Sequence, residues 1–184
     1  MMVDAFGRVD AARYVESPNC DERPSGAAIS LLVIHNISLP PGEFGGDGIE
    51  RLFANELDFD AHPYYRTLEG VRVSAHFLIR RSGELLQFVP CLKRAWHAGA
   101  SVWRGRSHCN DFSIGIELEG ADDVAYTDAQ YRQLAELARA LRSDYPVDGI
   151  AGHSDIAPLR KTDPGPSFDW PRFRASIASE PRSG

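Results

Sequence analysis

Several features that mark common protein classes are scarce or absent in this chain of 184 residues. No apolar run approaches the roughly 18 residues that suggest a membrane-spanning helix, so we expect no membrane partner. Lys and Arg number 20 against 26 Asp and Glu, the formal net charge is -6, and no basic block occurs. A nucleic-acid partner is therefore not expected, because such proteins carry a basic patch or stripe.

Cysteine is also sparse. Cys20, Cys91 and Cys109 lie far apart, are odd in number and form no CxxC pair. Neither a disulfide framework nor a cysteine zinc knuckle is indicated. The first 17 residues contain three acidic side chains and no apolar segment, which does not fit a secretory signal. These features favour a cytoplasmic location, and no segment indicates an obligate protein partner.

The motifs of several enzyme classes are missing. The chain has no GxSxG nucleophile elbow, no phosphate-binding P-loop and no GxGxxG after a strand. The compact zinc motif HExxH is absent as well. Any catalytic site must therefore be assembled from residues that are distant in the sequence.

The hydrophobic pattern predicts an α/β fold in which helices flank a mixed central β-sheet. The chain length fits one domain, and we expect a leader over 1–28 packed on the domain, the domain itself over 29–178, and a tail over 179–184. Thr127 followed by Gln130 is typical of a capping box at a helix start. Strands are expected at 29–36, 72–79, 85–89, 114–119 and 148–152, helices at 48–56, 127–142 and 168–177, and loops at 39–48 and 62–70.

The segment from Gly152 to Pro166 is unusually rich in groups that do chemistry. It offers an imidazole, a lysine and two carboxylates between glycines and prolines, so we expect an irregular site-forming loop. His35 ends an apolar strand far upstream. Together His35, His153 and Asp163 satisfy the ligand count of a catalytic zinc. From the residues alone, a hydrogen-bonded or surface histidine at position 35 is the commoner situation, and the ten-residue spacing is not a specific zinc signal.

Other polar residues have two open interpretations each. Glu117 lies in the middle of a strand, either on a solvated face or as the carboxylate that takes a proton from attacking water. Lys161 is either a surface lysine or a cation that holds negative charge on a tetrahedral intermediate. Trp96 and His97 precede two small residues, which suggests either a groove floor or a core tryptophan beside a hydrogen-bonded histidine.

Several long stretches are similar to one known family. Across residues 15–177 the chain resembles the AmpD-type 1,6-anhydro-N-acetylmuramyl-L-alanine amidases, which are zinc amidases of bacterial cell-wall recycling. T7-type lysozymes and peptidoglycan-recognition proteins share the fold more distantly. The matching stretches are LLVIHNISLPPGEFG from Leu31, VSAHF from Val73, RAWHAG from Arg94, CNDFSIGIELEG from Cys109, YTDAQY from Tyr126 and GHSDIAPLRKTDPGPSFDW from Gly152.

The resemblance implies hydrolysis of the amide between (1,6-anhydro-)N-acetylmuramic acid and L-alanine of a muropeptide, with one zinc ion per chain. The family has an arginine where this chain has His108, and Arg106 is the candidate to replace it. The resemblance implies zinc ligands at His35, His153 and Asp163, catalytic roles for Glu117 and Lys161, and substrate contacts from Asn36, Arg72, His97 and His108.

Two other functions compete with this interpretation. A recognition module would bind muropeptides without cutting them, but such relatives typically lack a metal ligand, whereas every ligand and catalytic position is filled here. An amidase of the cell envelope would act on intact murein. The missing secretory signal and the aspartate ligand at Asp163 argue against the envelope.

Overall fold

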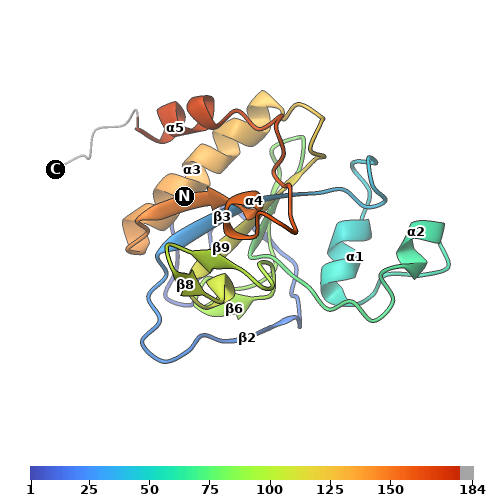
Figure 1. Cartoon of the computed structure of the whole chain (residues 1–184), viewed down its shortest axis with the longest axis horizontal. Coiled ribbons are helices and arrows are strands. Elements are labelled where there is room, and N and C mark those ends of the chain that lie inside the picture. The colour runs from blue at the N-terminus through green and yellow to red at the C-terminus, as the bar shows by residue number, and fades with distance from the viewer. Residues whose placement is uncertain (179–184) are drawn as a thin grey trace.

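The computed structural model describes residues 1–178, and a six-stranded mixed sheet forms its centre (Figure 1). Central strands β3, β9 and β10 run parallel, β4 is parallel to β9, and β4 and β5 form an antiparallel hairpin. The strand order is β1-β5-β4-β9-β3-β10. These strands are β1 (Arg13–Tyr14), β3 (Leu31–Ile37), β4 (Phe77–Ile79), β5 (Leu85–Gln87), β9 (Ser113–Glu119) and β10 (Gly149–Gly152).

Helices cover the sheet, which confirms the predicted α/β class. In Figure 1, α3 and α5 pack side by side over the sheet, while α1 and α2 stand to one side. The predicted capping box is present, because Thr127 Oγ1 accepts from Gln130 N and Gln130 Oε1 accepts from Thr127 N. The helices are α1 (Gly48–Ala54), α2 (Pro63–Arg66), the 3-10 turn η1 (Cys109–Asp111), α3 (Asp128–Asp144), α4 (His153–Ile156) and α5 (Trp170–Ala178).

The two faces of the sheet are buried by different segments. On one face, Ile114, Ile116 and Leu118 of β9 join the core formed with α3 and α5. On the opposite face, Leu31 and Val33 of β3 pack with Ala98, Phe112 and Ile156. Because side chains alternate along a strand, His35 and Glu117 project to this second face, which is covered by segment 96–112 and α4.

Three predicted segments differ from the structure. The strand expected over 72–79 is regular only over Phe77–Ile79, and the loop expected over 62–70 contains α2. The segment 152–166, expected to be irregular, begins with the single turn of α4. Outside the N-terminal residues, three short strands were not predicted: β6 (Lys93–Ala95), β7 (Val102–Trp103) and β8 (Arg106–Ser107).

The N-terminal residues pair with the rest of the domain through short strands and hydrogen bonds. Strand β1 lies at the edge of the central sheet, and β2 (Cys20–Glu22) pairs with β6. The Arg23 guanidinium donates to the carbonyl oxygens of Cys91 and Ser113, at 3.0 and 2.8 Å. The domain boundary expected at residue 28 stays a prediction, and the tail expected over 179–184 lies outside the described residues. Within residues 1–178, no helix has the length and apolar character needed to cross a membrane.

A buried ion pair fixes the loop that follows β3. Glu119, at the end of β9, accepts from Arg80 Nη1 at 2.9 Å and from the backbone N–H of Arg81 at 3.1 Å. It also accepts from the N–H of Gly45 at 2.7 Å, which ties the 39–48 loop to the sheet. The side chains of Arg80 and Glu119 are 8% and 3% exposed, so both charges are shielded from water, and Arg80 also pairs with Glu50 at 2.6 Å.

We expect Glu119→Ala to lower the free energy of unfolding by about 1–3 kcal/mol, because Arg80 loses one of its two carboxylate partners, keeping only Glu50 at 2.6 Å, and two backbone N–H groups lose their acceptor. Urea denaturation measures the change. Asp47→Ala is the matched control, since it removes the exposed Asp47–Arg51 pair and should leave the stability nearly unchanged. Equal losses in the two variants would show that burial does not decide the contribution of Glu119.

Candidate metal centre and active site

Strand register brings the first two predicted site residues together. In the parallel β3–β9 ladder, His35 lies directly opposite Glu117, so their side chains leave the same face of the sheet side by side. Both residues are buried, with exposed fractions of 2% and 8%. A histidine and a glutamate separated by 82 positions thus share one wall of the site.

The segment after β10 supplies the other two predicted ligands. His153 is the first residue of α4, and Asp163 follows in the loop. His35 Nδ1 lies 3.0 Å from His153 Nδ1 and 3.1 Å from Asp163 Oδ2, and His153 Nδ1 lies 3.1 Å from the same carboxylate oxygen. Three potential ligand atoms therefore converge on one point.

This donor set fits a metal ion. Tetrahedral ligands held about 2.0–2.1 Å from zinc are about 3.3 Å apart, close to the spacing of these three atoms. Two imidazoles and one carboxylate also form a common donor set for catalytic zinc, with a position left for water or substrate. The structure therefore supports a metal centre at His35, His153 and Asp163, as the sequence predicts.

The protonation states suit metal binding, which requires neutral imidazoles and an ionised carboxylate. Burial lowers the pKa of His35 to about 4, so its imidazole is neutral at pH 7. Burial acts to raise the pKa of Asp163, but hydrogen bonds from His153 and His35 outweigh it and hold this pKa well below its ordinary value. The neutral imidazole of His35 and the ionised carboxylate of Asp163 are the states that metal binding requires.

Glu117 is a buried carboxylate beside the metal centre. Its Oε2 atom is buried and has no hydrogen-bond partner among residues 1–178. Burial and, secondly, the charge of Asp163 raise the pKa of Glu117 well above its ordinary value, against the opposing charge of Lys161. A carboxyl group left unpaired in this way is costly for stability and is typical of a residue that exchanges protons.

The predicted substrate-contacting residues occupy different environments. Asn36 Nδ2 donates to Asp122 at 2.7 Å, while Arg72 and His108 are exposed. His97 has both ring nitrogens near protein partners, with Nδ1 2.9 Å from His35 and Nε2 3.1 Å from Ser113. Whether these four residues touch substrate stays a prediction.

Whether Arg106 replaces the missing arginine at position 108 stays a prediction. Its guanidinium lies 3.7 Å from the centre of the Phe112 ring and donates to Ser30 Oγ at 3.1 Å. His108 itself adopts the left-handed backbone conformation, with φ of 60°.

The sequence did not reveal the residues that hydrogen-bond to His97 and to the backbone of His97 and Ala98. Ser113 contacts His97, and Asn110 Oδ1 accepts from the backbone N–H groups of His97 and Ala98. No local signal marks Ser113, because its partner is defined only by the sheet register. Asp155, the second carboxylate of the 152–166 segment, is turned away to accept from Gly152 N at 2.7 Å.

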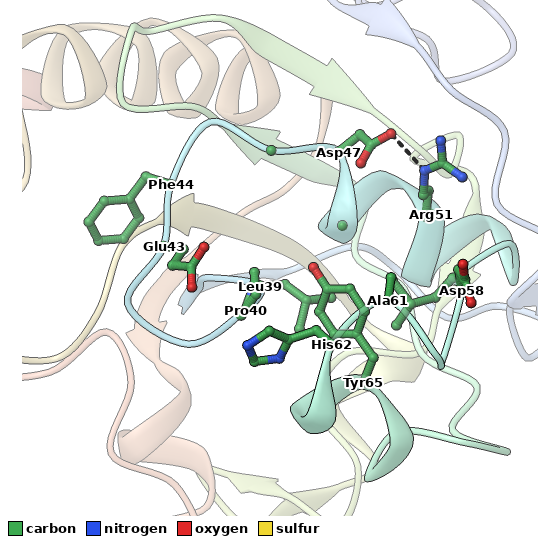
Figure 2. A pocket seen from close by; sticks show the side chains of 13 residues that line it. Leu39, Pro40, Glu43, Phe44, Asp47, Arg51, Asp58, Ala61, His62 and Tyr65 are labelled. Atoms are coloured by element: carbon green, nitrogen blue, oxygen red, sulfur yellow. Dashed lines mark hydrogen bonds and ion pairs between the residues drawn. The ribbon is translucent and has the colours of Figure 1, made fainter.

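A separate hollow of about 590 Å³ lies beside the loop that follows β3. Figure 2 shows the Asp47–Arg51 ion pair at one side and His62 beside Tyr65, whose ring centres are 5.4 Å apart. The apolar part of its lining comes from residues such as Leu39 and Leu57. None of the predicted metal, catalytic or substrate residues lines this hollow.

Comparison with known proteins places this site in a family. The family model described as N-acetylmuramoyl-L-alanine amidase matches residues 25–166. The 1,6-anhydro-N-acetylmuramyl-L-alanine amidase AmpD of Salmonella typhimurium (strain SL1344) is 62% identical over 179 residues, which are 96% of each chain. The crystal structure of a selenomethionine derivative of AmpD superposes with a TM-score of 0.94 at 59% identity, covering 96% of this chain and 99% of that one.

A more distant relative was solved with a ligand. The complex of Escherichia coli amidase AmiD with the substrate anhydro-N-acetylmuramic acid-L-Ala-D-γ-Glu-L-Lys has a TM-score of 0.59 at 32% identity, covering 84% of this chain and 60% of that one. The matched region includes the whole candidate site, from His35 to Asp163. The chain therefore belongs to the N-acetylmuramoyl-L-alanine amidase family and, within it, is an amidase of the AmpD type.

Proposed function

We propose that the protein is a zinc-dependent hydrolase that cuts the amide between (1,6-anhydro-)N-acetylmuramic acid and L-alanine of muropeptides during peptidoglycan recycling. The observation that carries the proposal is the buried Glu117 carboxyl group, whose Oε2 has no hydrogen-bond partner among residues 1–178, beside three converging ligand atoms. The names of the AmpD relatives and the substrate in the AmiD complex supply the substrate class.

The residues divide the chemistry between them. His35, His153 and Asp163 would hold the zinc ion, which when bound polarises the scissile carbonyl and lowers the pKa of a water ligand to about 7. Glu117 accepts a proton from the attacking water and delivers it to the leaving nitrogen. As the new C–O bond forms and the C–N bond breaks, the ammonium group of Lys161 offsets negative charge on the carbonyl oxygen.

We also propose that the enzyme acts in the cytoplasm on fragments returned from the cell wall. Its cysteines Cys20, Cys91 and Cys109 are all free, as is usual in a reducing compartment. The resemblance to AmpD-type enzymes supports the same location. Fractionation of cells that express the full chain tests it, because recovery in the envelope fraction would contradict the proposal.

Product analysis tests the reaction. The zinc-loaded protein is incubated in H₂¹⁸O with an anhydro-muropeptide and, separately, with its counterpart carrying the hydrated sugar. We expect a free peptide that begins with L-alanine and an anhydro-sugar acid that carries one ¹⁸O in its lactyl carboxylate. Label in the peptide instead, cleavage at another bond, or equal turnover without metal would contradict the proposed reaction.

A further inference from the structure

Two consecutive residues lie behind the two histidine ligands. His35 Nε2 is 2.9 Å from His97 Nδ1, and His153 Nε2 is 3.3 Å from the carbonyl oxygen of Ala98. In both histidines the other ring nitrogen, Nδ1, faces the metal centre. The segment 97–98 thus contacts the outer nitrogen of each ligand, which is where supporting groups orient metal-bound imidazoles.

The hydrogen bonds that run from His35 through His97 to Ser113 have a defined donor-to-acceptor direction. If Nδ1 of a neutral His35 binds the metal, its ring proton must be on Nε2, which then donates to His97 Nδ1. His97 carries its own proton on Nε2 in that case and donates it to Ser113 Oγ at 3.1 Å. One tautomer of each ring therefore satisfies every contact from His35 to Ser113.

Strand β9 is shaped to receive the His97 ring. Ser113, Gly115 and Glu117 alternate onto the same face of the sheet, and the ring of His97 lies over Gly115. A Cβ atom at Gly115 would come within 2.4 Å of His97 Cγ, closer than side chains pack. Absence of a side chain at this position is what lets His97 reach Ser113 and His35 together.

The backbone of the same segment is clamped independently. Asn110 Oδ1 accepts from the N–H of His97 at 3.2 Å and from the N–H of Ala98 at 2.8 Å. The Ala98 carbonyl accepts a further hydrogen bond from Arg160 Nη2 at 2.8 Å. These hydrogen bonds fix the backbone that carries the His97 ring and the Ala98 carbonyl group.

We propose that His97 is a positioning residue, which fixes the tautomer and ring orientation of His35 through the chain His35–His97–Ser113. The inference rests on the proposed metal site. It gives His97 a role in orienting His35, which differs from the substrate contact predicted for it. Loss of such supporting contacts typically lowers metal affinity by about 10–100-fold. We expect that loss for His97→Phe, which keeps a flat ring over Gly115 but has no ring nitrogen.

A double-mutant cycle on zinc affinity tests the proposal. The dissociation constant for zinc is measured by competition with a chromophoric chelator for the unaltered protein, His97→Phe, Ser113→Ala and the double variant. Ser113→Ala should weaken binding several-fold alone and have no effect in the His97→Phe background, because the hydroxyl acts only through His97 Nε2. The Co²⁺-loaded His97→Phe protein should show shifted visible absorption bands, since the ligand geometry changes.

Controls separate this role from general destabilisation. Ser17→Ala removes another buried hydroxyl, which bonds to the backbone of Phe53 and Asn19 and not to His35, His97 or Ser113, and should leave zinc affinity unchanged. Gly115→Ala displaces the ring without removing a polar group and should weaken zinc binding as His97→Phe does. If His97→Phe fails to fold, Ser113→Ala and Gly115→Ala still decide the question.

The outcomes distinguish the proposal from the function on which it rests. Unaltered zinc affinity in Ser113→Ala and Gly115→Ala, or an additive effect of Ser113→Ala in the His97→Phe background, would overturn the positioning role alone. A raised KM with unchanged zinc affinity in His97→Phe would assign His97 to substrate contact instead. Failure of the unaltered protein to bind zinc would overturn the metal site, and the positioning role with it.

Discussion

Glu117→Gln should lower kcat by about 10²–10⁴-fold, the usual contribution of general acid–base catalysis, while zinc content stays at one per chain. The amide occupies nearly the same space as the carboxylate, but it cannot accept a proton from water. None of the three converging ligand atoms belongs to Glu117, so the metal centre should survive. Steady-state kinetics together with metal analysis of the purified variant measure both effects.

The same substitution should make the metal-free protein more stable at neutral pH. Because burial raises the pKa of Glu117 above its unfolded value, the folded state binds the proton more tightly. The resulting penalty is absent below the unfolded pKa of about 4.5 and grows as the pH rises above it. The advantage of Glu117→Gln in urea unfolding should therefore be larger at pH 7 than at pH 4.

The exposed Glu136 on α3 provides the matched control. Glu136→Gln makes the same chemical change at a solvated position and should alter neither kcat nor the pH dependence of stability. Near-native kcat in zinc-loaded Glu117→Gln would contradict the proton-transfer role. Loss of zinc from that variant would instead show that Glu117 helps to hold the metal.

The sequence predicts the strands that build the site, and the reason is physical. The apolar run expected as a strand over 29–36 and the alternating run expected over 114–119 are each long enough to be recognised, and the structure has strands at Leu31–Ile37 and Ser113–Glu119. Helix α3 has a capping box and a buried stripe of leucines, which is an equally strong signal. Burial of Glu117 follows once these elements are stacked, but its place opposite His35 needs the strand order.

Short elements could not be predicted by periodicity. The four-residue α2 has too few turns for an apolar stripe, although Pro63 at its first position and the capping His62 are helix-start signals. In segment 72–76, the N–H of Ser74 donates to Trp96 O and that of His76 to Gly115 O, so the backbone is paired without forming a regular ladder. The alternating pattern there indicated an extended chain but not where regular pairing starts.

The site residues also differ in whether the sequence alone could predict them. His153 and Asp163 come from one segment whose composition marks it as a site, and His35 ends a recognisable strand. Ser113 and Asn110 support His97 through tertiary contacts that span 16 and 13 positions, and no spacing rule joins them. The residues proposed to hold the metal were therefore predictable by type, while the residues that contact them from behind required the folded register.

Asp163→Asn should abolish activity by removing the metal, whereas Asp155→Asn in the same segment should leave both intact. Asp163 Oδ2 is one of the three converging atoms, and an amide in its place brings no negative charge to the cation. We expect zinc affinity to fall by at least about 100-fold, more than the loss of a supporting contact causes. Metal titration and turnover at a fixed zinc concentration measure the two effects.

Asp155→Asn separates loss of a ligand from loss of a carboxylate. Asp155 Oδ2 accepts from Gly152 N at the start of α4, a role that an asparagine side-chain oxygen also fills. Its effect should be limited to a stability change of about 1 kcal/mol or less, because the cap is kept and only its charge is lost. If Asp155→Asn lost zinc as completely as Asp163→Asn, the ligand assignment would be wrong, since the geometry makes Asp163 the carboxylate that meets both histidines.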